Sequence, residues 1–247
     1  MIVKPCQHVG ETRVCIDKPL CSTAQSHLTH LWQISQQEQN KIVHKAIHMN
    51  SSLILASSSV IRLSLLRSAG IHVTECPAKI DESAIRLSMQ ADGAKPYDVA
   101  DTLAEIKARR IAEKYPENLV LGCDQILEIN EKILSKPENI AQVREQLDCL
   151  VGQTHRLLSA MVIYEHNQPV WRHIGIAKMT MRSFSQAYID GYLSRNWPDI
   201  STSLGGYKLE SEGVRLFSRI EGDYFTILGL PLLPLLGYLG DRGFLQT

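Results

Sequence analysis

The sequence predicts a mixed α/β fold with an elongated sheet. A regular alternation of strand-like and helix-like segments begins at Leu53, and the uninterrupted apolar run 119–123 is typical of a buried strand. Two long strand-like segments at about 155–165 and 168–182 are joined by a hairpin-like connection at 165–167. Neither a Walker loop nor a Gly-x-Gly-x-x-Gly motif occurs in the 247 residues, which argues against a P-loop ATPase and a dinucleotide-dependent dehydrogenase.

The chain divides near residue 49. Residues 1–49 have weak hydrophobic periodicity and scattered Gln, His and Ser residues. We predict that this segment is either disordered or a non-native extension, with native translation starting at Met49. Residues 50–247 are predicted to form a single domain, for which a hydrophobic content of 44% supplies ample core.

The charge balance favours small charged ligands over polymers. Lys plus Arg and Asp plus Glu number 26 each, and aromatic residues make up 6% of the chain, so no nucleic-acid partner and no membrane partner are expected. The sequence lacks an apolar run of roughly 20 residues and a secretory signal at its start. We therefore predict a cytoplasmic protein.

The strand at 53–56 leads into a serine-rich helix start. Ser57 and its two following serines are natural N-cap residues, and Gly70 suits the end of the helix. The apolar residues predicted to face inward are Ile61, Leu65, Leu66 and Ala69. A helix start directs backbone N–H groups at an anion, and Arg62 in the first turn adds a bidentate donor. The alternative is an ordinary capped helix with a surface arginine.

Acidic and basic residues follow at the next element boundaries. A strand is predicted at 71–76, after which Asp81 and Glu82 either cap a short helix at 83–89 or act as ligands. A longer amphipathic helix is predicted from Pro96 to Lys114. Lys107 lies beside the apolar face of that helix, where it either covers apolar surface with its stem or reaches into a cleft.

Asp124 is the catalytic candidate that the residue pattern favours most. It follows the apolar strand 119–123, and an acid in that position must be paired, hydrogen-bonded or metal-bound if it is buried. The alternative is an aspartate that forms a turn. Lys136 then opens a loop before a helix at about 138–150, and its side chain is either a ligand contact or solvated surface.

Further helices and strands are predicted in the second half of the chain, after the two long strands. These are a helix at about 185–195, strands near 206–219 after a glycine pair, and an apolar helix after Pro231. Across the chain, hydroxyls, cations and carboxylates fall where predicted elements end. A polyphosphate beside a divalent metal requires this combination, because its oxygens need cations and amides whereas the metal needs carboxylates.

The ordered motifs resemble the Maf family of nucleoside triphosphate pyrophosphatases over about Leu53 to Leu239. The matching residues are Leu55-Ala56-Ser57 with Arg62 and Leu65-Leu66, Asp81-Glu82, Leu103-Ala104 with Lys107-Ala108, Gly122-x-Asp124-Gln125, Lys136-Pro137, Leu150-x-Gly152 with His155, Tyr192, Gly205-Gly206-Tyr207, Ile220-Glu221-Gly222-Asp223-Tyr224 and Gly229-Leu230-Pro231. Independent surface charges would not be expected to fall in this order.

The resemblance implies a two-lobed, inosine triphosphatase-like α/β fold with a deep central cleft. The implied reaction converts a nucleoside triphosphate, with modified or noncanonical bases among the candidate substrates, to the monophosphate and pyrophosphate. Asp124 matches the proton acceptor, and Glu82 together with Asp124 matches the ligands of a divalent cation, Mg²⁺ or Mn²⁺. Ser57 and Arg62 match the phosphate-binding loop, while Lys107 and Lys136 match its basic contacts.

The chain departs from the common family pattern at the positions linked to base discrimination. Ile61 replaces an arginine, Gln125 stands where many thymidine or uridine triphosphate hydrolases have Thr, and Glu210 stands where many have Gln. An ionised buried acid accepts but does not donate hydrogen bonds, so Glu210 would present a different edge to a base than Gln does. The family also suggests an alternative role as a nucleotide-binding regulator of septum formation that acts through a protein partner, and a homodimer is compatible with both roles.

Overall fold

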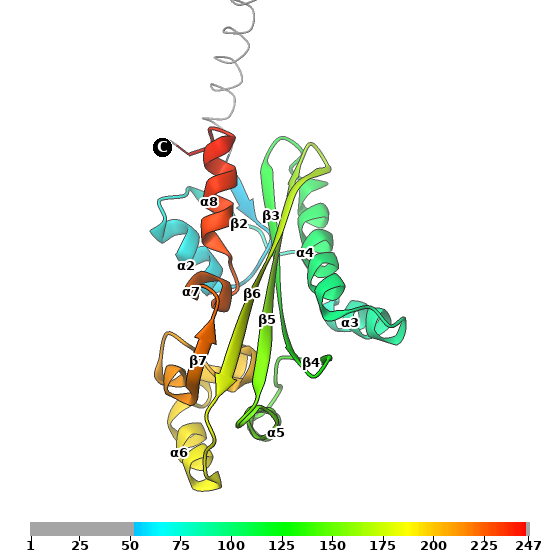
Figure 1. Cartoon of the computed structure of the whole chain (residues 1–247). Coiled ribbons are helices and arrows are strands. Elements are labelled where there is room, and N and C mark those ends of the chain that lie inside the picture. The colour runs from blue at the N-terminus through cyan, green and yellow to red at the C-terminus, as the bar shows by residue number, and fades with distance from the viewer. Residues whose placement is uncertain (1–51, 246–247) are drawn as a thin grey trace, which may run out of the picture. The chain divides into compact units, whose positions relative to one another are not determined.

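A seven-stranded mixed sheet forms the centre of the protein (Figure 1). The computed structural model describes residues 52–245, which belong to one compact unit of the chain. The strands are β1 (Leu53–Leu55), β2 (Val73–Glu75), β3 (Leu119–Ile129), β4 (Lys132–Leu134), β5 (Thr154–Glu165), β6 (Gln168–Met181) and β7 (Phe217–Glu221). The predicted α/β class is confirmed, whereas the predictions for residues 1–49 lie outside the described part of the chain.

The sheet combines a short parallel part with a longer antiparallel part. Its order is β2-β1-β3-β5-β6-β7, and β4 pairs with β3 beside this path. β1 pairs in parallel with both β2 and β3, while β3, β5, β6 and β7 pair antiparallel in sequence. The long hairpin of β5 and β6 confirms the strands predicted at 155–165 and 168–182.

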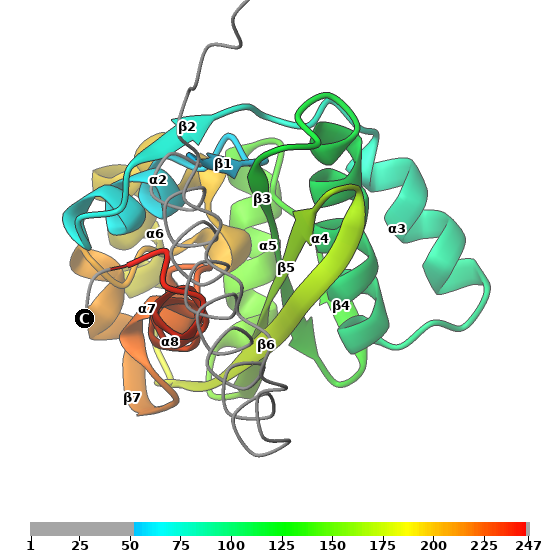
Figure 2. The ribbon, with the colours of Figure 1, turned by 90° about the horizontal axis from the view of Figure 1, so that it is seen from above.

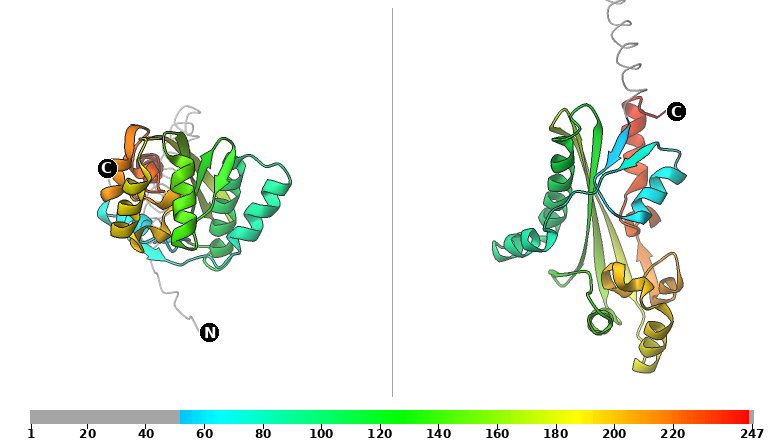
Figure 3. Two further views of the ribbon diagram at one scale, coloured as in Figure 1. Left: turned by 90° about the horizontal axis from the view of Figure 1, so that it is seen from below. Right: turned by 180° about the vertical axis from the view of Figure 1, so that it is seen from behind.

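Helices cover both faces of the sheet. They are α2 (Val60–Ser68), α3 (Glu82–Ala91), α4 (Pro96–Ala112), α5 (Ile140–Leu150), α6 (Gln186–Asn196), α7 (Tyr224–Ile227) and α8 (Leu232–Asp241). α4 lies on one face, α2 and α8 lie on the other, and α5 and α6 lie at the far end of the long strands (Figures 1 and 3). Figure 2 shows the same arrangement from above, with α3 extending beyond α4. Among residues 52–245, no helix combines the length and the hydropathy that a membrane crossing requires.

Three apolar clusters hold these layers together. One lies between α4 and the sheet and includes Val99 and Leu103, and a second lies beneath α2 and α8 and includes Leu66 and Leu235. The third cluster packs α5 and α6 against the far ends of the strands, around the fully buried Tyr192. Burial of these side chains is the main stabilising contribution, because each large apolar side chain contributes about 1.5–3 kcal/mol when it leaves water.

One edge of β3 is interrupted between its two partners. β1 pairs with residues 119–121 and β4 pairs with residues 127–129, whereas β5 runs along the whole opposite edge. Among the described residues, the edge at 122–126 therefore has no strand partner. Asp124 and Gln125 lie in this gap, and because successive side chains of a strand point to opposite faces, they face opposite sides of the sheet.

Gly122 lets α4 approach β3 closely. A Cβ atom at this position would lie 2.1 Å from the carbonyl oxygen of Ala104 and 2.6 Å from the backbone nitrogen of Ala108. Both alanines are fully buried and small, so the helix backbone rests directly on the strand. This contact brings Lys107 of α4 to the level of Asp124.

One prediction about local structure is wrong, and another is incomplete. Residues 206–216 form turns and 3-10 segments instead of a strand, and only β7 is extended in the predicted range 206–219. Gly205 and Gly206 have φ angles of 71° and 68°, which an extended chain does not adopt. In α2, Leu66 is buried as predicted, and the partly buried Leu65 and Ala69 pack against the same apolar cluster. Arg62 and Leu63 are buried as well, although the apolar spacing did not predict this.

Candidate active site

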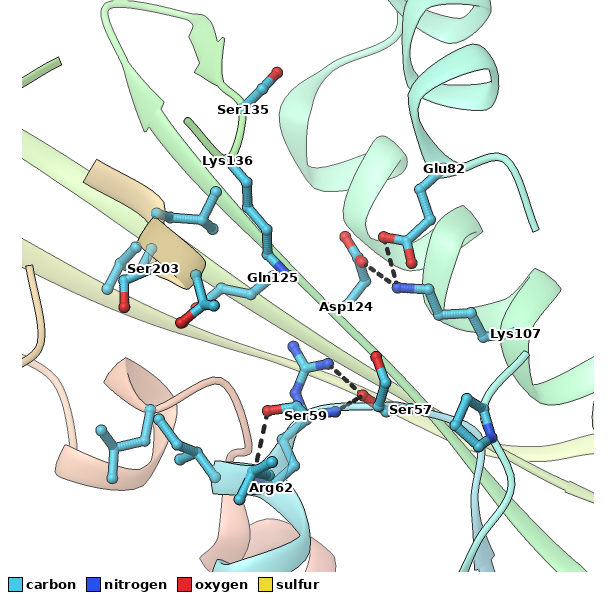
Figure 4. Close-up of a pocket in the computed structure, with 18 of the residues that line it drawn as sticks. Ser57, Ser59, Arg62, Glu82, Lys107, Asp124, Gln125, Ser135, Lys136 and Ser203 are labelled. Carbon is cyan, nitrogen blue, oxygen red and sulfur yellow. Dashed lines mark hydrogen bonds and ion pairs between the residues drawn. The ribbon is translucent and has the colours of Figure 1, made fainter. Parts of the chain in front are cut away.

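Asp124, Lys107 and Glu82 form one ion-pair cluster at the gap in the sheet (Figure 4). The Nζ atom of Lys107 lies 2.7 Å from Oδ1 of Asp124 and 2.9 Å from Oε2 of Glu82. The side chains of Lys107 and Asp124 are each 7% exposed, whereas that of Glu82 is 45% exposed. Two carboxylates from α3 and β3 therefore converge on one ammonium group, and Lys107 does not act as an ordinary surface lysine.

Burial makes Asp124 a stronger base than an exposed aspartate. Removal from water raises the pKa of its carboxyl, and the neighbouring Lys107 ammonium opposes this shift by stabilising the ionised form. A raised pKa gives a carboxylate more driving force to accept a proton, while the ion pair holds its orientation. The geometry thus supports the prediction that Asp124 accepts a proton.

Asp81 and Glu82 have different roles, although they are adjacent. Oδ1 of Asp81 accepts a hydrogen bond from the backbone nitrogen of Ala84 at 2.9 Å and caps α3. Glu82 begins the helix and points to Lys107. The capping alternative therefore applies to Asp81, and the ligand alternative is compatible with Glu82.

The serine loop and Arg62 form the opposite wall of the cleft. Ser59 caps α2, and Oγ of Ser57 accepts hydrogen bonds from the backbone nitrogen of Ser59 and from Nη1 of Arg62 at 3.3 and 3.0 Å. Nε of Arg62 donates to the carbonyl oxygen of Gly229 at 2.8 Å, and Nη1 also donates to that of Cys123 at 3.1 Å.

Arg62 is consequently held in place by the protein. It is buried, at 8% exposure, and the bonds above engage Nε and Nη1. Among the hydrogen bonds between described residues, none involves Nη2, so this nitrogen is the part of the guanidinium left to contact an anion. The alternative of a surface arginine is wrong, because the side chain links α2 to β3 and to Gly229.

Lys136 points into the cleft from the loop after β4 (Figure 4). Its pKa is lowered because burial disfavours the charged ammonium and because the Arg62 cation lies nearby. It forms no ion pair with any residue in the range 52–245. An unpaired cation beside buried Asp124 is suited to contact a ligand with several negative charges.

The cleft around these residues has a volume of about 1360 Å³. Its lining includes all the side chains predicted from the sequence: Ser57, Ile61, Arg62, Glu82, Lys107, Asp124, Gln125, Lys136 and Glu210. The structure therefore brings together residues that are far apart in the chain. Glu210 is exposed at the rim, so the expectation of a buried acid at this position is wrong.

Gln125 faces the side of the cleft formed by α7. Its Nε2 donates to Oγ of Ser159 at 3.0 Å and to the carbonyl oxygens of Thr226 and Ile227 at 3.2 and 3.0 Å. The amide nitrogen is thus engaged by the protein. Of the two polar atoms of this side chain, Oε1 is left to accept a hydrogen bond from a ligand.

Tyr207 forms part of the cleft wall and is fixed by a buried histidine. Nε2 of His155 and the Tyr207 hydroxyl lie 2.6 Å apart, and His155 is 1% exposed. Burial lowers the pKa of His155 to about 4, so its ring is neutral near pH 7. Nδ1 of His155 has no hydrogen-bond partner among the described residues.

Sequence analysis missed Arg86, which lines the cleft, and two buried hydroxyl residues that contact Gln125. Arg86 lies one helical turn after Glu82 and also lines the cleft. Ser159 is fully buried in an otherwise apolar part of β5, and Thr226 is buried beneath it. Ser159 could have been found as a hydroxyl residue within an apolar strand, because a buried polar group requires a hydrogen-bond partner.

Two carboxylates are available to a metal ion in this cleft. Among residues 52–245, no group of three or more His, Cys, Asp and Glu side chains gathers in a way that could hold a metal. Glu82 and Asp124 nevertheless fit Mg²⁺, which commonly binds through one or two carboxylates and takes its remaining ligands from water and substrate phosphates. Glu82 is exposed enough to turn towards such an ion.

The fold and cleft define an α/β protein whose cleft, beside the end of β1, is lined by cationic, acidic and hydroxyl side chains. The chain belongs to the Maf family, since the family model described as "Maf-like protein" matches residues 52–242. A nucleoside triphosphate pyrophosphatase of Ruegeria sp. (strain TM1040) is 50% identical over 198 residues, which cover 80% of this chain and 100% of that protein.

Further similar proteins include a relative with a more specific name. A 7-methyl-GTP pyrophosphatase of Rhizobium etli is 46% identical over 195 residues, covering 79% of this chain and 98% of that protein. Among solved structures, a HAM1 protein from Coxiella burnetii has a TM-score of 0.39 and 16% identity, and covers 53% of this chain and 73% of that chain.

Proposed function

We propose that this protein is a divalent-metal-dependent nucleoside triphosphate pyrophosphatase that prefers a 7-methylated guanosine triphosphate. The observation that carries the proposal is the buried Asp124–Lys107 pair beside Glu82, opposite the start of α2. It combines a proton acceptor, carboxylate oxygens and phosphate-binding groups in one cleft. The names of the Ruegeria and Rhizobium relatives support the same reaction class.

In the proposed reaction, Asp124 orients a water molecule and accepts its proton during in-line attack on the α-phosphorus. The new bond joins the water oxygen to the α-phosphorus, and the bond to the bridging oxygen of pyrophosphate breaks. Lys107 holds the Asp124 carboxylate in place at 2.7 Å. Lys136 and Nη2 of Arg62 stabilise the negative charge on the phosphates and on the leaving group.

Glu82 and Asp124 are the residues that would hold Mg²⁺ or Mn²⁺. When bound, such an ion neutralises phosphate charge and increases the acidity of bound water. The exposed Glu82 and the buried Asp124 together provide the acceptor oxygens that a hard cation prefers.

The acceptors near the base-binding side support a guanine-type substrate. Oε1 of Gln125 and the carboxylate of Glu210 accept hydrogen bonds, and guanine presents adjacent N1–H and N2–H donors. Methylation at N7 adds a positive charge to the base, which favours a nearby carboxylate. Partly buried Ile61 also lines the cleft and supplies apolar contact there.

Pyrophosphate release from a panel of triphosphates tests this function. With Mg²⁺ or Mn²⁺, we expect turnover of 7-methyl-GTP to exceed that of GTP, UTP and dTTP. Asp124→Asn keeps the shape of the side chain but removes the proton acceptor, so activity should fall by about 10²- to 10⁴-fold. Circular dichroism should show an unchanged fold.

Asp241→Asn is the matched control, because Asp241 lies at the exposed end of α8, outside the residues that line the cleft. This variant should keep full activity. Absence of pyrophosphate release from every nucleotide in the panel would refute the proposed activity. Tight nucleotide binding without release would instead favour the regulatory role.

A further inference from the structure

The amide of Gln125 is held in a single orientation. Its Nε2 donates to the carbonyl oxygens of Thr226 and Ile227 at 3.2 and 3.0 Å, and carbonyl oxygens can only accept. Rotating the amide by 180° would place Oε1 against these two acceptors. The nitrogen side therefore faces α7, and Oε1 is the atom left for a ligand.

Ser159 sets the direction of this hydrogen-bond chain. Its hydroxyl donates to the carbonyl oxygen of Thr226 at 2.8 Å, so it acts as an acceptor towards Nε2 of Gln125 at 3.0 Å. The residue is 0% exposed and is surrounded by apolar residues of β5. Its hydroxyl thus has a defined partner on each side.

Gln125 and Ser159 lie in register with a glycine on the next strand. Gln125 of β3 pairs with Ser159 of β5, and Ser159 pairs with Gly175 of β6. A Cβ atom at Gly175 would lie 2.5 Å from Oγ1 of Thr226 and 2.7 Å from Cγ of Pro231. The absence of a side chain at Gly175 allows α7 to rest on the sheet directly beside Ser159.

Asp223 fixes the turn that carries the two carbonyl groups. Its Oδ1 accepts a hydrogen bond from the backbone nitrogen of Thr226 at 2.9 Å, and its Oδ2 accepts one from the Thr226 hydroxyl. Asp223 caps α7 through these bonds and is not one of the residues that line the cleft. It acts on Gln125 only through the position of α7.

We propose that Ser159 and Asp223 are positioning residues that set nucleobase selectivity by holding Gln125 with Oε1 towards the substrate. This inference rests on the proposed function, because it assigns Gln125 to recognition of the nucleoside part. The recognised group is an N–H or O–H donor such as the amino edge of guanine. A released amide would present Nε2 as well and would accept a base with a carbonyl oxygen at that position.

Equilibrium binding of non-hydrolysable analogues tests the inference without turnover. Calorimetry gives the Kd of the α,β-methylene analogues of GTP and UTP, and their ratio measures selectivity. The wild-type protein should prefer the GTP analogue. Ser159→Ala should reduce the ratio about three- to tenfold, which corresponds to the loss of one hydrogen bond.

Two further comparisons separate positioning from general destabilisation. Asp223→Ala should reduce the ratio similarly, whereas Asp223→Asn should preserve it, because Asn also caps helices. In a Gln125→Ala background, Ser159→Ala should leave the ratio unchanged, since the residue it positions is gone. Ser218→Ala is the control, because Ser218 is an exposed serine whose hydroxyl donates to the carbonyl oxygen of Thr180.

The inference is overturned if Ser159→Ala leaves the ratio unchanged in the otherwise wild-type protein. It is also overturned if Ser159→Ala has the same effect with and without Gln125, or if the wild-type protein binds neither analogue. Should Asp223→Ala not fold, Ser159→Ala and its double variant decide the result. Failure to release pyrophosphate refutes the proposed activity alone, because the selectivity measurement does not depend on catalysis.

Discussion

Replacing Gly122 by alanine should disturb both stability and catalysis through one contact. The added Cβ atom would lie 2.1 Å from the carbonyl oxygen of Ala104, 2.6 Å from the nitrogen of Ala108 and 2.8 Å from its Cβ atom. Two of these three neighbours are backbone atoms, so no side chain can rotate away. The helix α4 must retreat from β3 by about 1 Å to restore an ordinary van der Waals separation.

Such a shift changes the geometry around Lys107. The lysine lies on α4 between the two alanines, and its Nζ lies 2.7 Å from Asp124. A retreat of about 1 Å would lengthen this contact beyond hydrogen-bond distance. We expect a loss of about 1–3 kcal/mol in the free energy of unfolding from overpacking, and a fall of about 10²-fold in kcat from the misplaced carboxylate.

Urea unfolding and pyrophosphate release measure the two effects separately. Gly237→Ala is the matched control, because Gly237 lies inside α8 and a Cβ atom there would meet nothing within 4 Å. That substitution should stabilise the protein by about 0.5–1 kcal/mol and leave activity unchanged. If Gly122→Ala keeps both wild-type stability and wild-type kcat, close packing of α4 does not position Lys107.

Three other predictions concern pH, charge and metal. The pKa of His155 is near its ordinary value of 6.5 in the unfolded chain and about 4 in the folded chain. Between these two pH values the unfolded state binds more protons than the folded state. The free energy of unfolding therefore falls as the pH falls through this window. At pH 4.5 this contribution is about 2–3 kcal/mol. Urea unfolding of His155→Gln should therefore show a correspondingly smaller loss of stability between pH 7 and 4.5, and an unchanged loss would contradict the assignment. Lys136→Met should raise KM for the triphosphate about tenfold or more, because an unpaired cation leaves the cleft, and steady-state kinetics would contradict this if KM and kcat both stayed constant. Removal of divalent ions with a chelator should abolish pyrophosphate release and added Mg²⁺ or Mn²⁺ should restore it, whereas full activity in the chelator would exclude a required metal.

The sequence predicted the regular elements because their patterns are local. Pro96 at the first turn and the apolar spacing after it correctly placed α4, and the continuous apolar run before Asp124 correctly placed β3. The same reasoning identified Asp124, since a carboxylate within buried surroundings needs a partner. It did not reveal that the partner is Lys107, because this pair depends on how closely α4 approaches the strand.

Long-range contacts explain what the sequence left out. The apolar spacing of α2 did not predict that Arg62 is buried, because Gly229, which accepts its hydrogen bond, lies far along the chain. The turns around Gly205 likewise depend on positive φ angles that hydrophobic periodicity does not report. Ser159 was overlooked because its partners in α7 are distant in sequence.

The gap in the sheet at residues 122–126 gives adjacent positions of one strand separate tasks. Asp124 contacts α4 on one side of β3, and Gln125 contacts α7 on the other. If the proposed roles of Asp124 and Gln125 hold, substitutions in α7 would alter which nucleotide is accepted while the contacts of Asp124 stay intact. This separation would let substrate preference change during evolution through residues near Gln125, while the residues that contact Asp124 stay the same.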